Sequence, residues 1–160
     1  MTLTATPAIE VRRRPRSVVV TCTLLAILGV SAVGGGGAMI LGIGGESMIP
    51  NEYLDFIPLI SSWVVPGLVL AIGFGIGSLF TLYGMLTRPS WRWVDVLERR
   101  SGHHWSWVAT IAIAVGQVTW ILIELATIPF SVLMPIFGLI GLALALLPNL
   151  TSVKEYLRTS

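Results

Sequence analysis

The sequence predicts an all-α fold, a four-transmembrane-helix bundle with a short interfacial helix in its central loop. The first observation is composition, because 54% of the 160 residues are hydrophobic and only 11% are charged. A soluble domain carries about a quarter charged residues, so this chain lacks the polar surface needed to cover itself in water. The second observation is that the apolar residues form long blocks rather than periodic stripes, which is typical of a protein whose solvent is lipid.

Four apolar blocks are long enough, or nearly so, to cross about 30 Å of hydrocarbon. They cover residues of about 17–43, 63–86, 105–128 and 130–147, and the last is shorter and lies between Pro129 and Pro148. Each block should be helical, because backbone polar groups in lipid must be paired within the segment. The expected organisation is a basic tail (1–16), a transmembrane domain (17–148) and a second tail (149–160). The first block is too long for a cleaved signal peptide.

The basic residues predict the orientation of the spans. All ten precede the first block, lie between the second and third, or follow the fourth. The first outer loop instead carries Glu46, Glu52 and Asp55. By the positive-inside rule, both termini and the central loop are cytoplasmic, in a multi-pass protein of the bacterial cytoplasmic membrane. The basic residues are Arg12, Arg13, Arg14, Arg16, Arg88, Arg92, Arg99, Arg100, Lys154 and Arg158.

The central loop should contain a short helix, with Ser90 as its N-cap and Gly102 as its C-terminal stop. Such a helix would lie in the membrane interface, where it serves as a connector, a docking face or a patch for anionic lipid. Its apolar side would carry Trp93, Val94, Val96 and Leu97, and its polar side Arg92, Asp95, Glu98 and Arg99. Aromatic residues expected at headgroup level are Trp91, Trp93, Trp105, Trp107 and Tyr156 inside, with Trp63 and Phe130 outside.

Glycines within the spans predict where helices pack closely. Gly73 and Gly77 are four residues apart, the spacing that lets two helix backbones approach. Phosphate-binding loops also use glycine, but they open a helix and usually carry a lysine, and these glycines have no basic neighbour. The predicted packing set is Gly34, Gly35, Gly36, Gly37, Gly73, Gly77, Gly138 and Gly141.

Glu124 is the candidate for chemistry within the membrane. It lies in the outer half of the third span, and Gln117 and Trp120 share its helix face. A carboxylate at this depth is costly unless it is paired, hydrated or protonated. Gln117, Trp120 and Glu124 therefore form a candidate polar site, either for a proton or cation or for a structural contact near the outer surface.

Other chemistry has little support. The adjacent His103 and His104 cannot both turn easily to one ion, so we expect polar interface residues rather than a metal site. Cys22 is the only cysteine, which excludes an intramolecular disulfide. Catalytic and cofactor-binding motifs are absent, so neither an enzyme nor a cofactor is predicted. Nucleic-acid binding is not expected, because the basic residues lie beside apolar blocks and not on one face of a domain.

Three elements resemble a group of small, uncharacterised bacterial integral membrane proteins with four spans. They are the glycine-rich first span, the outer loop leading to Pro66-Gly67, and residues 120–124 before a glycine-bearing last span. This resemblance implies a fold and a location, and no activity. The function we expect is a non-enzymatic accessory or scaffold subunit, whose partners are the lipid bilayer and other membrane subunits or a second copy. The alternative is a small transporter or channel that uses Glu124, and a lipid-modifying enzyme is third.

Overall fold

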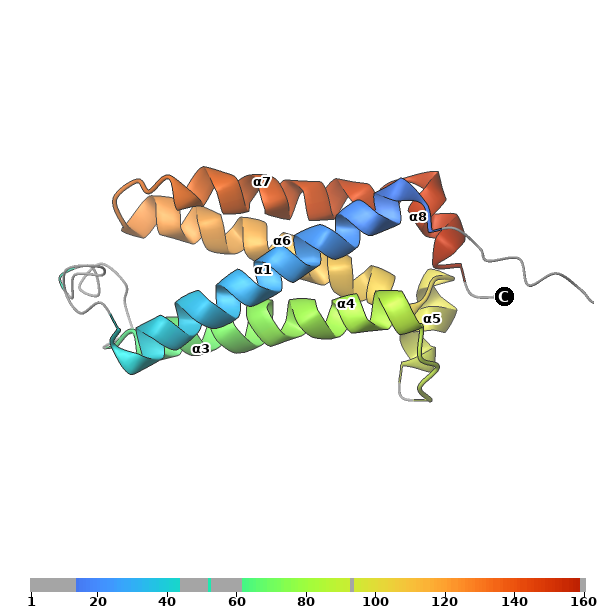
Figure 1. Ribbon diagram of the computed structural model, residues 1–160, viewed down its shortest axis with the longest axis horizontal. Helices are drawn as coiled ribbons and strands as arrows, with labels where there is room; N and C mark the ends of the chain where they lie inside the picture. The colour runs from blue at the N-terminus through green and yellow to red at the C-terminus, as the bar shows by residue number, and fades with distance from the viewer. Residues whose placement is uncertain (1–13, 44–51, 53–61, 93, 159–160) are drawn as a thin grey trace, which may run out of the picture.

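The computed structural model describes residues 14–43, 52, 62–92 and 94–158, and within them it is helical, with no strand. The first thirteen residues and most of the first outer loop, with Glu46 and Asp55, lie outside this part. Figure 1 shows the long helices side by side in one bundle. The elements are α1 (Arg16–Leu41), α3 (Val64–Leu68), η2 (Val69–Ile76), α4 (Gly77–Thr87), α5 (Asp95–Ser101), α6 (Trp105–Thr127), α7 (Leu133–Leu146), η3 (Leu147–Asn149) and α8 (Thr151–Tyr156).

Three helical segments are long and apolar enough to cross a membrane: α1, the continuous run from α3 through η2 to α4, and α6. Their ends lie within two residues of the predicted ones. The end of the bundle where α1 begins, α4 ends and α6 begins is called the inner end below, and the opposite end is called the outer end (Figure 1). The helical bundle predicted from the apolar blocks is thereby confirmed.

The fourth apolar helix is shorter than the other three. We expected it to begin at Phe130, but α7 begins at Leu133, and Phe130 is 72% exposed. Ser131 explains the late start, because its hydroxyl accepts a hydrogen bond from the backbone N–H of Leu133 at 3.3 Å. A serine that pairs an otherwise free N–H group favours the first turn of a helix over its interior.

The middle of the second span is a π-helix, which the sequence pattern did not predict. Over Val69–Ile76 the turns are wider than in an α-helix, and the N–H of Gly77 reaches back to the carbonyl of Ile72. Wide turns of this kind are rare and are frequently found at functional sites. Phe74 lies within this segment and is buried, with 8% of its surface exposed.

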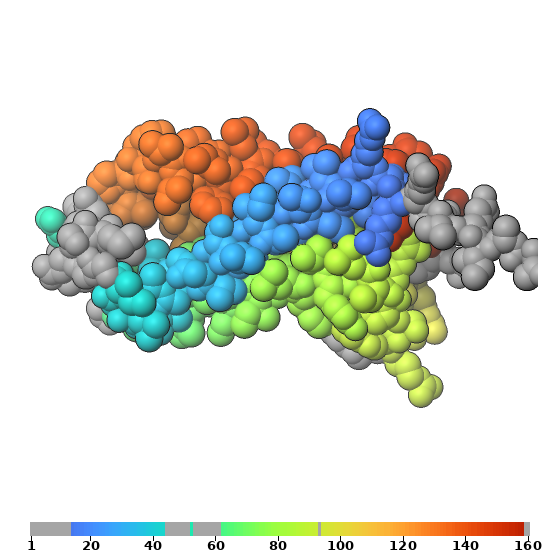
Figure 2. Space-filling view, viewed as in Figure 1, coloured from blue at the N-terminus to red at the C-terminus, as the bar shows by residue number. Residues whose placement is uncertain are grey.

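The bundle is built from two helix pairs, α1 with the second span and α6 with α7. α1 runs diagonally, from α8 at the inner end to α3 at the outer end (Figure 1). Figure 2 shows a hollow between the outer half of α1 and the α6–α7 pair. The two pairs are therefore packed together more closely at the inner end than at the outer end.

The apolar core lies in the inner half of the bundle and includes part of the expected C-terminal tail. Residues 149–160 were predicted as a tail, yet Thr151–Tyr156 form α8. Val153 and Leu157 are completely or almost completely buried, at 0% and 1% exposure. They join a cluster drawn from all four long helices: Val18, Cys22, Leu25, Leu28, Met85, Ala114 and Leu144.

The short helix of the central loop is present as α5, and Gly102 ends it in the left-handed conformation at φ 67°, as predicted. The predicted N-cap is wrong, because the helix begins at Asp95 after Val94 and Ser90 does not cap it. Its two sides also differ from the prediction. Val94 is buried against the bundle, and the side chain of Glu98 turns inward to contact α6. The side chain of Trp93 lies outside the described part.

Candidate functional site

Two of the three predicted polar residues of α6 contact each other. The indole Nε1–H of Trp120 donates to a carboxylate oxygen of Glu124 at 2.7 Å. Both side chains are half-buried, and they are one helix turn apart. A hydrogen bond from a neutral donor stabilises the carboxylate without neutralising its charge. Trp120 therefore provides one hydrogen bond to the carboxylate of Glu124, which can accept more.

Phe74 of the π-helix covers the indole of Trp120. Their rings meet edge to face, with centroids 6.0 Å apart and planes at 62°. Gly116 makes this approach possible, because a Cβ there would lie 3.1 Å from the ring of Phe74. Phe74 was not among the predicted site residues, because a change from α to π geometry leaves no hydrophobic pattern that could identify it.

Gln117 lies in a different environment from Trp120 and Glu124. Its side chain packs on Gly141 of α7, where a Cβ would be 3.1 Å from Gln117 Cγ. It is 2% exposed, and within the described part of the chain its Oε1 has no hydrogen-bond partner. The hydroxyl of Ser78, also buried, has none either. An unpaired buried polar atom costs about 1–3 kcal/mol of folding stability. The amide oxygen of Gln117 therefore destabilises the fold unless a ligand or another donor binds it.

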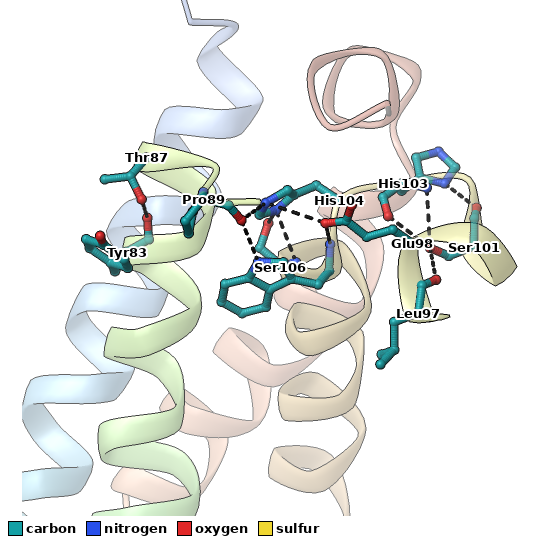
Figure 3. A network of polar contacts seen from close by, with 10 residues as sticks. Tyr83, Thr87, Pro89, Leu97, Glu98, Ser101, His103, His104 and Ser106 are labelled. Atoms are coloured by element: carbon teal, nitrogen blue, oxygen red, sulfur yellow. Dashed lines mark hydrogen bonds and ion pairs between the residues drawn. The ribbon is translucent and has the colours of Figure 1, made fainter. Parts of the chain in front are cut away.

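A second polar site lies at the inner end, around His104 (Figure 3). His104 Nδ1 accepts a hydrogen bond from the N–H of Ser106 at 3.4 Å and so caps α6. Because Nδ1 accepts, the ring proton belongs on Nε2, which lies 3.3 Å from the carbonyl oxygen of Pro89. Glu98 Oε1 is 3.7 Å from the same nitrogen and accepts from the N–H of Trp105 at 3.2 Å.

Burial lowers the pKa of His104, and the Pro89 carbonyl and the charge of Glu98 offset this only in part. The imidazole is therefore neutral at physiological pH, as its role as a hydrogen-bond acceptor from Ser106 requires. His104 is 6% exposed and is a structural residue, because its ring connects the start of α6 to Glu98 of α5 and to the carbonyl of Pro89. No local sequence signal indicates this role, because the partners of His104 are distant along the chain.

His103 belongs to a different group of contacts from His104. Its Nδ1 lies 2.7 Å from the carbonyl oxygen of Ser101, and its ring stacks on Trp107 with centroids 5.0 Å apart. Figure 3 shows the two imidazoles pointing in different directions. Over the described residues, no group of three or more His, Cys, Asp or Glu side chains could hold a metal ion.

Aromatic rings fill the space next to His104. Trp105 stacks on Trp91 with centroids 5.5 Å apart, and Phe80 lies 5.2 Å from Trp105. Trp105 is 4% exposed, so its side chain packs inside the protein. The ring lies directly on Gly84, where any larger side chain would collide with it.

The predicted packing glycines divide into two groups. Gly36 and Gly141 are in tight contact with neighbouring helices, where an added Cβ would be crowded. At Gly35 and Gly138 an added Cβ would make an ordinary van der Waals contact, at 3.5 and 3.6 Å. In the second group, an added Cβ would meet no other helix within 4 Å among the described residues: Gly34, Gly37, Gly73 and Gly77.

Other glycines make much of the close contact within the chain. A Cβ at Gly75 would lie 2.6 Å from the Val33 side chain, and one at Gly67 would lie 2.8 Å from the Gly36 carbonyl oxygen. Gly29 likewise packs against Leu79. Gly29 and Gly36 are seven residues apart on one face of α1, a spacing that could have identified them.

No protein-family model matches this chain, and no curated protein or solved structure was found to be similar to it.

Proposed function

We propose that the protein is a multi-pass protein of the bacterial cytoplasmic membrane with four spans, and that its termini and central loop are cytoplasmic. The three long apolar helices support this proposal, as does α7 with η3. Fourteen α-helical residues and three 3-10 residues give a length of about 27 Å, close to the thickness of the hydrocarbon core. The basic residues of the described part all lie toward the inner end, which the positive-inside rule assigns to the cytoplasm.

Within that membrane, the protein acts as a non-enzymatic accessory or scaffold subunit that packs against a transmembrane helix of another subunit. The observation that carries this proposal is the outward position of Gly73 and Gly77 on the second span. Glycine inside a helix is about 0.5–1 kcal/mol less favourable than alanine, so it is expected where close packing requires it. Gly36, Gly67 and Gly75 meet that requirement inside the chain. Within the described part of the chain Gly73 has no such neighbour, and a helix from a second subunit would supply one.

The test is native mass spectrometry of the tagged protein, extracted gently from its host membrane. We expect a different protein in fixed stoichiometry. Gly73→Leu should remove that protein, because the leucine side chain holds the two helices apart. Ile72→Leu is the matched control, since Ile72 is adjacent on the same helix and 56% exposed. A complex that survives Gly73→Leu and Gly77→Leu would contradict the proposed interface.

A second candidate function is that of a small transporter or channel. The observation that favours it is the set of acceptors on α6, namely the unpaired Oε1 of Gln117 and the partly paired carboxylate of Glu124. The two residues are seven apart, which places them roughly 10 Å from each other along the helix axis. Acceptors without matching donors attract a proton or a cation.

Glu124→Gln tests this second function, because the amide oxygen can still accept from Trp120 while the charge is lost. Proton or cation flux into proteoliposomes should then fall to the level of empty vesicles. Glu155→Gln is the control, since Glu155 is an exposed carboxylate on α8 at the inner end. Unchanged flux in a folded Glu124→Gln protein would rule out this function, and a purely homo-oligomeric wild-type protein would favour it over the accessory role.

A further inference from the structure

The outward face of α5 combines an exposed apolar side chain with two exposed arginines. Val96 is 60% exposed, and Arg99 and Arg100 follow it by three and four residues. Residues at these spacings are neighbours on a helix surface, so the two guanidinium groups flank the valine. Among the described side chains, neither arginine has an ion-pair or hydrogen-bond partner. This Val96–Arg99–Arg100 face is therefore free to contact something outside the chain.

One of the two carboxylates of α5, that of Glu98, is directed away from this face. Glu98 is 17% exposed, and its carboxylate accepts from the N–H of Trp105 and lies 3.7 Å from His104. Asp95 is the remaining carboxylate of the helix. The exposed side of α5 thus carries two arginines against one aspartate, and a positive surface is complementary to an anionic partner.

The position of α5 limits what that partner can be. The helix lies between the end of α4 at Thr87 and the start of α6 at Trp105. Buried Val94 fixes its beginning, and Glu98 joins it to α6. Figure 1 shows α5 at the inner end, beside the end of α4. If the long helices span a bilayer, α5 lies where they leave the hydrocarbon, at the level of the lipid phosphates.

We propose that the Val96–Arg99–Arg100 face of α5 binds the headgroups of anionic phospholipids. Val96 inserts among the upper acyl segments, while the two guanidinium groups contact lipid phosphates. This arrangement suits arginine, whose planar group matches phosphate oxygens and whose aliphatic stem packs on apolar surface. The proposal rests on the membrane placement proposed above and is independent of the partner at Gly73.

The test uses the full chain in nanodiscs of phosphatidylcholine, with or without phosphatidylglycerol. A polarity-sensitive fluorophore is attached at Val96→Cys in a Cys22→Ala background. We expect a blue-shifted emission that is larger with phosphatidylglycerol and that shrinks as salt is raised, because salt screens surface charge. Arg99→Gln with Arg100→Gln should abolish the phosphatidylglycerol-dependent part. Lys154→Gln with Arg158→Gln removes the same amount of charge from the inner end, and this variant should keep the phosphatidylglycerol-dependent part of the shift.

Several results would overturn the proposal. Water-like emission in both lipids would place Val96 outside the membrane. Identical shifts in the two lipids, at low and high salt, would exclude recognition of the anionic headgroup even if the arginine variant failed to fold. A shift in pure phosphatidylcholine on adding soluble glycerol phosphate would indicate a site for free phosphate instead. Nanodiscs expose both leaflets equally, so the emission of the probe at Val96 does not depend on which way the protein is oriented. The orientation itself is measured separately, by fusion reporters in the host membrane.

Discussion

The two ends of the helix bundle are held together by different kinds of contact. At the inner end, polar side chains join elements that are far apart in sequence. The hydroxyls of Ser17 and Ser152 are 2.7 Å apart, and Trp107 Nε1 donates to the carbonyl oxygen of Pro148 at 2.9 Å. The backbone N–H of His104 donates to the carbonyl oxygen of Leu157 at 2.7 Å. These contacts tie α1, α6 and the C-terminal segment together.

At the outer end, the first two spans meet through glycine backbone. A Cβ at Gly36 would lie 2.6 Å from the Ala71 nitrogen and 2.9 Å from the Ala71 side chain. The side-chain hydrogen bonds of α6 in this half stay within the helix: Trp120 donates to Glu124, and the hydroxyls of Thr119 and Thr127 donate to backbone carbonyls of the preceding turn. The outer end therefore depends on surface fit between helices.

The difference shows two means of holding helices together. Hydrogen bonds between distant segments join the elements of the inner end, and each bond needs a donor and an acceptor in line. Small residues at the outer end let two helix backbones approach, so close packing supplies the attraction there.

Gly36→Ala should destabilise the protein most, by about 1–3 kcal/mol, because the added methyl group meets the backbone of the neighbouring helix. Gly34→Ala is the matched control, since no described residue lies within 4 Å of a Cβ at Gly34. Thermal unfolding in mild detergent measures the difference. Equal stability of the two variants would show that the outer contact between α1 and the second span is not tight.

His104→Ala should cost about 1–2 kcal/mol, because it removes the cap of α6 and leaves the Pro89 carbonyl and Glu98 without this partner. His103→Ala removes the same type of residue from a half-exposed position and should cost less. The same unfolding measurement applies. A larger loss for His103→Ala would mean that the contacts around His104 do not hold the inner end together.

The Ser17–Ser152 hydrogen bond should contribute about 0.5–1 kcal/mol, typical of hydrogen bonds between helices of membrane proteins. A double-mutant cycle with Ser17→Ala and Ser152→Ala isolates this value as the coupling energy. Zero coupling would indicate that α8 is joined to α1 by apolar packing of Val153 and Leu157 alone.

Acidification should have the smallest effect and should act at the inner end. Burial holds the pKa of His104 below its ordinary value of 6.5. The unfolded chain then binds the proton more readily, so the stabilising contribution present above about pH 6.5 is lost as pH falls through the lowered pKa. The Tm should therefore be lower at pH 5 than at pH 7.5, and His104→Gln should reduce that difference. An unchanged difference would assign the pH dependence to other groups.

Local sequence signals were sufficient for the elements whose formation depends on local physics. The three long helices follow from uninterrupted apolar blocks, and the end of α5 follows from the freedom of Gly102 to adopt a positive φ. The start of α7 at Leu133 was missed because the Ser131 hydroxyl competes with the helix for one N–H group. The π-helix at Val69–Ile76 was missed because its wide turns change no pattern of apolar and polar residues.

Composition and the length of the apolar blocks were enough to predict a helical, apolar chain, because lipid requires every backbone group to be paired locally. Its charged residues, Glu124 apart, lie at the ends of the long helices or between them. Which glycines meet a neighbouring helix, and which, like Gly73, face outward, became clear from the packed helices. The packed structure also shows that Trp120 pairs with Glu124 beneath Phe74, and that His104 links α5 to α6. Those relationships depend on how the helices are rotated and crossed, and rotation is set by packing between helices.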